Sequence, residues 1–216
     1  LEISNCRATN GGGIFCIGNF SVSELIMTNN FATNGAASIY AAATSISDFK
    51  ISNSLIVQGN VEQINEGRTV YSNYAVYISG YKVNINNPVF RENHSNTTTL
   101  YLNNCLLDGE NSTLAKTSAE KGVGIFEKNI AHSNNDLVAG AMIVNANGTY
   151  EYKFSNIKFL SNDASEGGYG AVLVQGQYNG ANGVSFENCE FKQNVGLYAG
   201  GLAFAPAGVG TKFGGN

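Results

Sequence analysis

The side chains in this sequence that could do chemistry are few, and the carboxylates come first. Glycoside hydrolysis uses two carboxylates that face each other across a sugar, and a polysaccharide lyase uses Asp-bound calcium with a basic proton acceptor. Asp occurs only at Asp48, Asp108, Asp136 and Asp163. No two of them share a strand-like segment with alternate spacing, so the sequence predicts no catalytic pair, no metal site of this kind and no cofactor.

The two histidines, His94 and His132, each closely follow an Asn that belongs to a repeated motif. They lie one repeat apart, so they could approach each other on the surface and bind a metal ion. Two ligands without a nearby Cys or a third His make a weak zinc site. Solvent-facing turn residues are the simpler interpretation, and no metal site is predicted.

Tyr71, Tyr74, Tyr77 and Tyr81 form the one concentration of aromatic residues that suggests binding. On a flat sheet face, tyrosine rings can stack on sugars or meet the surface of a partner. The intervals between these residues do not keep all four on one face of a strand, because side chains alternate between the two faces. We therefore predict a ligand platform to which only some of them contribute.

The acceptor pattern for N-glycosylation, Asn-x-Ser/Thr, gives a second set of candidate sites. It occurs at Asn19, Asn93, Asn96, Asn111 and Asn147. Glycans at these positions require a eukaryotic secretory source, because the pattern has no meaning in a bacterial protein.

The four cysteines do not form a disulfide scaffold. Cys6 and Cys16 lie in neighbouring strand-like segments and could form a disulfide in an oxidising compartment. Cys105 and Cys189 fall in repeats that are too far apart to meet easily. The alternative is that all four thiols fill the core as small apolar groups, so cysteine usage leaves the compartment open.

The composition argues against two classes of protein. A net charge of −4, scattered along the chain, lacks the basic stripe that a nucleic-acid surface needs. No window approaches the roughly eighteen apolar residues of a membrane-spanning segment. The chain begins at Leu1 without a signal-peptide pattern. We expect residues 1–216 to form a single domain that is a segment of a longer chain or a unit stacked end to end.

A repeat positions all of these side chains, and its clearest copy runs from Phe186 to Phe204, FENCEFKQNVGLYAGGLAF. An apolar residue is followed three positions later by Asn, and a small-residue strand comes next. The unit recurs upstream as FLSN, FEKN, FREN, VQGN and MTNN, with a weaker RATN that ends at Asn10. Alternating apolar positions, with Gly and Asn at short intervals, favour a parallel β-helix over a helical repeat.

Equivalent positions of successive repeats should lie above one another in such a fold. We expect an apolar row inside it and an Asn row at a tight turn, where Asn adopts the left-handed conformation and bonds to its neighbours. Gly-Gly and Gly-Ala steps should form a second corner. About seven rungs are expected, with loops near Asn65, Asn111, Asn135 and Asn179. The predicted rows comprise Asn30, Asn60, Asn93, Asn129, Asn162 and Asn194, and Phe90, Phe126, Phe159 and Phe191.

Three pairs of motifs also resemble a known family: FKQN with GGLAF, FLSN with GAVLV, and FEKN with GAMIV. They are similar to the alternating FxxN and GGA(I/L/V) repeats of chlamydial polymorphic outer-membrane proteins and of related protist surface proteins. The resemblance implies a right-handed parallel β-helix that is displayed outside the cell, in a passenger or adhesin role.

The sequence therefore favours a non-catalytic, extracellular all-β protein in which a rigid β-helical rod serves as a surface adhesin, a filament subunit or a coat component. Its expected partners are a protein or a glycan at a cell surface, or further copies of itself joined end to end. Two alternatives stay open. One is a carbohydrate-active enzyme, either a polysaccharide lyase or a hydrolase, and the other is a carbohydrate-binding module that uses the tyrosines.

Overall fold

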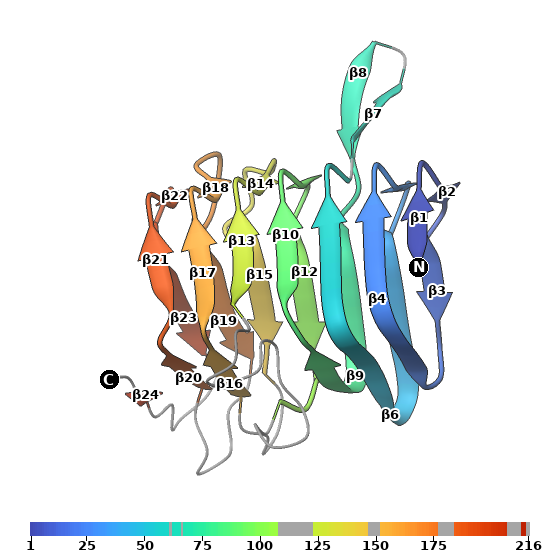
Figure 1. The fold of residues 1–216 in the computed structure, drawn as a ribbon. Helices are drawn as coiled ribbons and strands as arrows, with labels where there is room; N and C mark the ends of the chain where they lie inside the picture. The colour runs from blue at the N-terminus through green and yellow to red at the C-terminus, as the bar shows by residue number, and fades with distance from the viewer. Residues whose placement is uncertain are drawn as a thin grey trace.

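A computed structural model gives the fold, and it describes residues 1–60, 62–65, 67–107, 123–146, 152–176, 184–206 and 213–214. Every regular element in these residues is a β-strand, and the strands are mostly parallel. Figure 1 shows them side by side in two main layers. Within the described ranges, no helix is long and apolar enough to cross a lipid bilayer. The prediction of an all-β protein is confirmed.

One 13-stranded sheet makes up most of the fold. It contains β1 (Glu2–Ser4), β3 (Ile14–Cys16), β4 (Phe20–Thr28), β6 (Ala36–Gln58), β9 (Tyr74–Ile85), β10 (Pro88–Arg91), β12 (Thr98–Asn103), β13 (Gly124–Glu127), β15 (Ala139–Asn145), β17 (Ile157–Leu160), β19 (Val172–Gly176), β21 (Glu190–Lys192) and β23 (Leu202–Pro206). Its main order is β21-β17-β13-β10-β6-β9-β12-β15-β19-β23. The long strand β6 pairs with strands of both layers, so the sheet curls like a half-barrel.

Smaller groups of strands lie at the two ends of the layers in Figure 1. Two of them are parallel sheets, one of β11 (His94–Ser95), β14 (Ile130–Ala131), β18 (Asp163–Ala164) and β22 (Val195–Gly196), and one of β16 (Tyr152–Ser155), β20 (Val184–Glu187) and β24 (Phe213–Gly214). A parallel pair joins β2 (Arg7–Ala8) to β5 (Phe31–Ala32). An antiparallel hairpin of β7 (Glu62–Asn65) and β8 (Arg68–Tyr71) projects where the sequence predicted a loop near Asn65.

The other predicted loops fall in different parts of the chain. Asn135 lies in the connection between β14 and β15. Asn111 and Asn179 lie outside the described residues.

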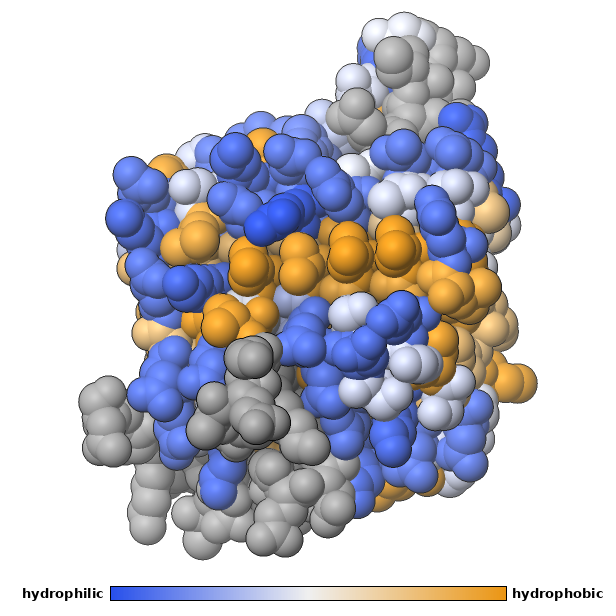
Figure 2. Space-filling model, in the orientation of Figure 1, coloured by the Kyte–Doolittle hydropathy of each residue, from blue (hydrophilic) through white to orange (hydrophobic). Residues whose placement is uncertain are grey.

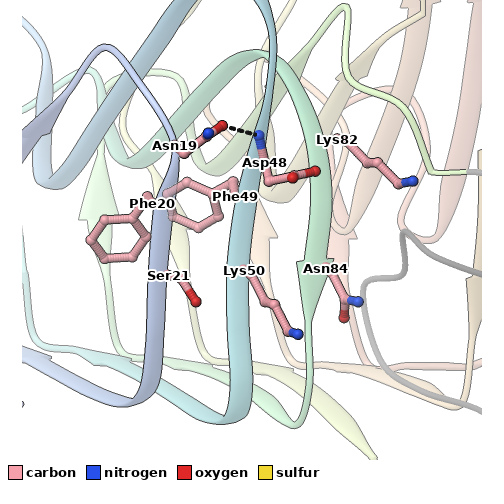
Figure 3. Close-up of a pocket in the computed structure, with 8 residues that line it drawn as sticks. All are labelled: Asn19, Phe20, Ser21, Asp48, Phe49, Lys50, Lys82 and Asn84. Carbon is pink, nitrogen blue, oxygen red and sulfur yellow. Dashed lines mark hydrogen bonds between the residues drawn. The ribbon is translucent and has the colours of Figure 1, made fainter.

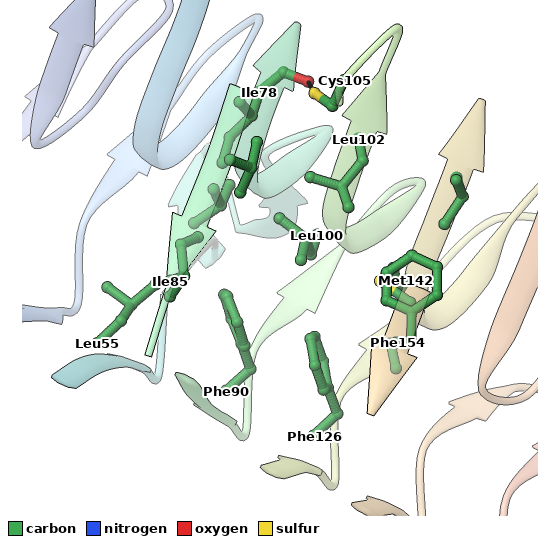
Figure 4. Packing of buried hydrophobic residues seen from close by; sticks show 14 of the residues in the cluster. Leu55, Ile78, Ile85, Phe90, Leu100, Leu102, Cys105, Phe126, Met142 and Phe154 are labelled. Atoms are coloured by element: carbon green, nitrogen blue, oxygen red, sulfur yellow. Dashed lines mark hydrogen bonds between the residues drawn. The ribbon is translucent and has the colours of Figure 1, made fainter. Parts of the chain in front are cut away.

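An apolar row runs through the interior because successive repeats pair in register. Phe90 pairs with Val57 on one side and with Phe126 on the other, and the row continues through Phe159 to Phe191. The four Phe rings stack with successive centroid distances of 4.6, 5.1 and 4.8 Å. Figure 4 shows Phe90 and Phe126 packed with the aliphatic side chains between the layers. The row supplies much of the core.

A second row consists of buried Asn side chains. The side-chain Nδ2 of Asn129 donates to the Phe90 carbonyl (3.0 Å) and to Asn162 Oδ1 (2.9 Å). Its own Oδ1 accepts from the backbone N–H (3.2 Å) and from Nδ2 (2.9 Å) of Asn93. The same backbone N–H to Oδ1 bond links every neighbouring pair from Asn30 to Asn194. Each Asn from Asn30 to Asn162 therefore bonds to the repeats on both sides.

The left-handed conformation expected of the row Asn residues belongs to the residue before each of them. Asn29, Gly59, Glu92, Lys128, Ser161 and Gln193 have φ between +52° and +60°. A left-handed residue interrupts the alternation of a strand, and this lets the Asn one position later point inward. Asn does adopt positive φ at two other turns, one before β10, β17 and β21 (Asn87, Asn156 and Asn188) and one after β12 (Asn104).

The first repeat also differs from the prediction. Ile3 pairs with Met27, and the backbone N–H of Cys6 donates to Asn30 Oδ1 (3.0 Å). Cys6 therefore occupies the row position that the motif RATN assigned to Asn10. The true first copy is ISNC, in which a thiol replaces the Asn amide.

Glycine at the predicted second corner allows neighbouring backbones to approach closely. A Cβ atom on Gly140 would lie 2.5 Å from the Gly170 carbonyl oxygen, and one on Gly170 would lie 2.4 Å from the Gly200 carbonyl oxygen. No side chain fits at such distances. Close approach between repeats, and not positive φ, is what requires glycine here.

We predict that Asn129→Leu lowers the free energy of unfolding by about 3 kcal/mol, because buried polar groups in three repeats lose their partners. The matched control is Asn134→Leu, an exposed position, where a change within about 0.5 kcal/mol is expected. Urea denaturation followed by circular dichroism measures both variants. Equal stability of the two variants would show that the Asn row does not hold the repeats together.

Candidate functional site

The four tyrosines of the predicted platform separate into three environments. Tyr81 is fully buried, and its hydroxyl donates to the Gly18 carbonyl (3.0 Å). Tyr71 ends the projecting hairpin, where its ring stacks on His132 with centroids 4.1 Å apart. Only Tyr74 and Tyr77 share an outer face, with centroids 5.3 Å apart. Only these two remain candidates for the predicted platform, because β9 bends at Gly80 (φ +75°) and turns Tyr81 inward.

Tyr77 belongs instead to an aromatic row on the outer face of the sheet. The row runs from Phe15 through Tyr40 and Tyr77 to Tyr101, which pair in register on β3, β6, β9 and β12. Successive ring centroids lie 5.7, 4.9 and 5.6 Å apart, and each pair is stacked. Tyr40 and Tyr101 were not among the predicted site residues. Their place in GAASIY and TTLYL, equivalent to Phe15 in GGGIFC, was the available signal.

This stacking decides what the outer row can bind. Each inner ring has a neighbouring ring against both of its faces, so it presents mainly its edge and hydroxyl group. Tyr77 Oη accepts from Asn103 Nδ2 (3.3 Å), and Tyr101 Oη accepts from Gln175 Nε2 (3.3 Å). Asn145 Nδ2 in turn donates to Asn103 Oδ1 (2.7 Å). A partner would meet hydroxyl and amide groups here, and not a flat aromatic platform.

Burial keeps two hydroxyls here in their neutral form, that of Tyr101 in the row and that of Tyr74 beside it. Burial raises the pKa of Tyr74 to about 12, and the neighbouring Tyr101, Tyr77 and Tyr40 act in the same direction. Burial also raises the pKa of Tyr101, although its hydrogen bond with Gln175 opposes the shift. These tyrosines therefore act as neutral hydrogen-bonding groups near neutral pH.

A pocket of about 420 Å³ lies on another outer face, over β4, β6 and β9. Figure 3 shows its lining, in which Asp48 pairs in register with Lys82, and Lys50 pairs with Asn84. The Asn19 side chain closes one side, where its Oδ1 accepts from the Asp48 backbone N–H (2.9 Å). Two lysines, one Asp and two Asn residues thus line one opening. This lining suits an anionic ligand that also carries hydroxyl groups.

The structure does not bring the other carboxylates of the prediction to this pocket. Asp136 Oδ1 accepts from the Tyr198 hydroxyl (2.7 Å), and Asp163 Oδ1 accepts from the Ser165 backbone N–H (2.7 Å). Asp108 lies outside the described residues. Asp48 is the single carboxylate among the residues that line the pocket.

The two histidines do come together. His94 Nδ1 and His132 Nε2 are 3.2 Å apart, and Glu166 Oε1 lies 3.4 Å from His132 Nδ1. Across the described part of the chain, no group of three or more His, Cys, Asp and Glu side chains is arranged to hold a metal ion. The contact between the histidines is the one feature of this corner that the sequence suggested.

The predicted glycosylation sites have different accessibility. Asn93 is fully buried in the Asn row, and its Nδ2 donates to the Val57 carbonyl (2.9 Å), so glycosylation there is incompatible with the fold. Asn96 is half-buried, and its Nδ2 donates to the Tyr71 carbonyl (2.9 Å). Asn19 is exposed beside the pocket. Asn111 and Asn147 lie outside the described residues.

All four cysteines are free thiols in this structure, which corresponds to the alternative without a Cys6–Cys16 disulfide. Each of these two sulfurs is turned toward a carbonyl two residues away, Cys6 toward Ser4 (3.3 Å) and Cys16 toward Gly18 (3.1 Å). Cys105 is fully buried, and burial raises the pKa of its thiol to about 12. Burial also raises the pKa of Cys189.

Comparison with models of known protein families, with curated proteins and with solved structures finds no match for this chain. The function must therefore be inferred from its own geometry.

We predict that iodoacetamide at mildly alkaline pH labels Cys6 and Cys16 in the folded chain and leaves Cys105 unmodified. Alkylation needs a thiolate that the reagent can reach, and Cys105 is both buried and protonated. Mass spectrometry of the digested protein measures labelling at each cysteine, and the urea-unfolded chain is the control in which all four react. Rapid labelling of folded Cys105 would contradict its position in the core.

The raised pKa of Cys105 predicts that the folded chain loses stability at alkaline pH. Its folded pKa of about 12 lies above the ordinary value of 9.0, so the unfolded chain releases this proton first as pH rises. The free energy of unfolding should therefore fall between about pH 9 and pH 12. Cys105→Ala should make that decline shallower in urea titrations across the range, and a decline of unchanged slope would exclude Cys105 as a contributor.

Proposed function

We propose that the chain is part of a right-handed parallel β-helix that acts as a non-catalytic structural or adhesive rod at a cell surface. The observation that carries this proposal is the pair of interior rows, the stacked Phe rings and the hydrogen-bonded Asn side chains. Every repeat along these rows is bonded to the repeats on both sides. Such an arrangement resists bending, as a rigid scaffold must.

The parallel pairing supports a coil of this type. Each strand of the front layer in Figure 1 pairs with its equivalent in the next repeat, and the chain visits the back layer in between. Crossover connections between parallel strands of one sheet are right-handed in about 98% of cases. That preference supports a right-handed coil.

An apolar band on the outer surface supports a role in contact with other molecules. Figure 2 shows the band running across the front layer. The outward positions of this layer pair in register from Ile26 through Ile56 and Val89 to Ile125, and all four side chains remain partly exposed. Continuous apolar surface of this kind often marks an interaction site. The band ends at the ion pair between Lys158 and Glu190 (3.7 Å).

The location outside the cell rests on the motif resemblance. In FREN, FEKN, FLSN and FKQN, the Phe lies in the apolar row and the Asn lies in the Asn row. The shared letters therefore correspond to the residues that stabilise the fold. Chlamydial polymorphic outer-membrane proteins and the related protist surface proteins suggest the setting, a surface-displayed passenger or adhesin.

The proposal predicts that antibodies against the purified chain label intact, unpermeabilised cells of the source organism. A rod that works at the surface must be accessible there. Immunofluorescence before and after permeabilisation measures this, with an antibody to a cytosolic protein as the control for intact membranes. Labelling that appears only after permeabilisation would place the chain inside the cell and contradict the proposal.

Carbohydrate binding is a second candidate, favoured by the pocket lined by Asp48, Lys50 and Lys82. Lysine ammonium groups pair with carboxylate or sulfate groups, and Asn side chains bond to hydroxyls. We predict that a glycan array detects binding to acidic oligosaccharides, and that the double substitution of Lys50 and Lys82 by Gln reduces the signal at least tenfold.

Lys192→Gln, at an exposed position outside the pocket, is the matched control and should leave glycan binding unchanged. Binding that persists in the double variant would exclude the pocket as its site. Cleavage of an array sugar that is lost in Asp48→Asn would instead identify an enzyme.

A further inference from the structure

We propose that His94 and His132 chelate a divalent transition-metal ion, such as Zn²⁺ or Ni²⁺, at the corner formed by β11 and β14. Neutral imidazole is a preferred ligand of these ions. His94 begins β11, and His132 directly follows β14, so adjacent repeats supply the two rings. Their facing nitrogens, His94 Nδ1 and His132 Nε2, are 3.2 Å apart.

This separation fits a metal ion bound by both nitrogens. Zinc–nitrogen bonds of about 2.0–2.1 Å across a gap of this size subtend an angle of about 100° at the metal. That angle lies between the octahedral and tetrahedral values. Tyr71 stacks on His132 at an interplanar angle of 9°, which holds the plane of that ring.

Glu166 orients His132 for metal binding through a contact with its Nδ1 atom. Its Oε1 lies 3.4 Å from His132 Nδ1, on the side of the ring away from His94. When the carboxylate accepts the Nδ1 proton, the lone pair of His132 lies on Nε2, the nitrogen that faces His94. Carboxylate–histidine–metal arrangements use this contact to orient the ligand and to raise its basicity. Glu166 is therefore a positioning residue.

The site is open to solvent, which suits an exchangeable ion. The side chain of His132 is 20% exposed and that of Glu166 is 59% exposed. Two protein ligands leave the remaining coordination positions to water or to a group on another molecule, one more open position than in catalytic zinc sites with three protein ligands. A group on a partner that completes the coordination would join that partner to this corner.

Isothermal titration of the untagged protein with ZnCl₂ and NiCl₂ near neutral pH tests the proposal. The chain should carry Cys6→Ser, Cys16→Ser and Cys189→Ser, because partly exposed thiols also bind these ions. We expect one equivalent of metal with micromolar affinity. His94→Asn and His132→Asn should each weaken binding more than tenfold, and Glu166→Gln should weaken it about tenfold.

Glu187→Gln, an exposed carboxylate on β20, is the control and should leave the affinity unchanged. A second measurement needs no variant: Zn²⁺ should protect His94 and His132 from modification by diethyl pyrocarbonate in the parent chain. No binding at millimolar metal, full binding in His132→Asn, or modification that ignores Zn²⁺ would each overturn the proposal.

Discussion

The hydrogen bonds of the buried Asn side chains are the interaction on which the rest of this structure depends. A chain that turns tightly between parallel strands leaves backbone groups inside the turn that no strand can pair, and burying them unpaired is costly. In each repeat the Asn Nδ2 donates to a backbone carbonyl of the preceding repeat. The Oδ1 of the same side chain accepts from the backbone N–H of the preceding repeat's Asn. The buried backbone groups of the turn therefore have hydrogen-bond partners only when neighbouring repeats are in register.

That register explains the apolar core. Once the Asn residues are aligned, the position three residues earlier must also align, because the intervening turn is the same in each repeat. Phe90, Phe126, Phe159 and Phe191 then have no alternative but to stack. A one-residue slip would expose the rings and break the Asn bonds together. Packing and hydrogen bonding therefore select the same register, and this agreement favours a single native state.

The spacing of apolar residues and Asn was sufficient to predict an all-β fold and to select the residues of both rows. Local features were harder to predict. Nothing in the letters of FEKN shows that Lys128 carries the left-handed conformation, since the equivalent positions hold Asn29, Gly59, Glu92, Ser161 and Gln193, which share no residue type. Which tyrosines face outward was not predictable, because the strand bends at Gly80 and the simple alternation of faces does not continue through the bend to Tyr81. The first copy of the repeat was assigned to RATN because Cys6, and not Asn, occupies the first position of the Asn row.

The candidate sites lie at positions where the repeat constrains the residue type least. Positions that point inward are occupied by similar side chains in every repeat, whereas the outer row changes from Tyr101 to Ile143, Leu173 and Ala203. The contact between the two histidines does not depend on strand register at all. His94 pairs with Ile130 and not with His132, so the two rings meet through their position at the turn and not through strand register. Equivalent residues stack to build the scaffold, while chemistry arises from non-equivalent residues that the scaffold happens to bring together.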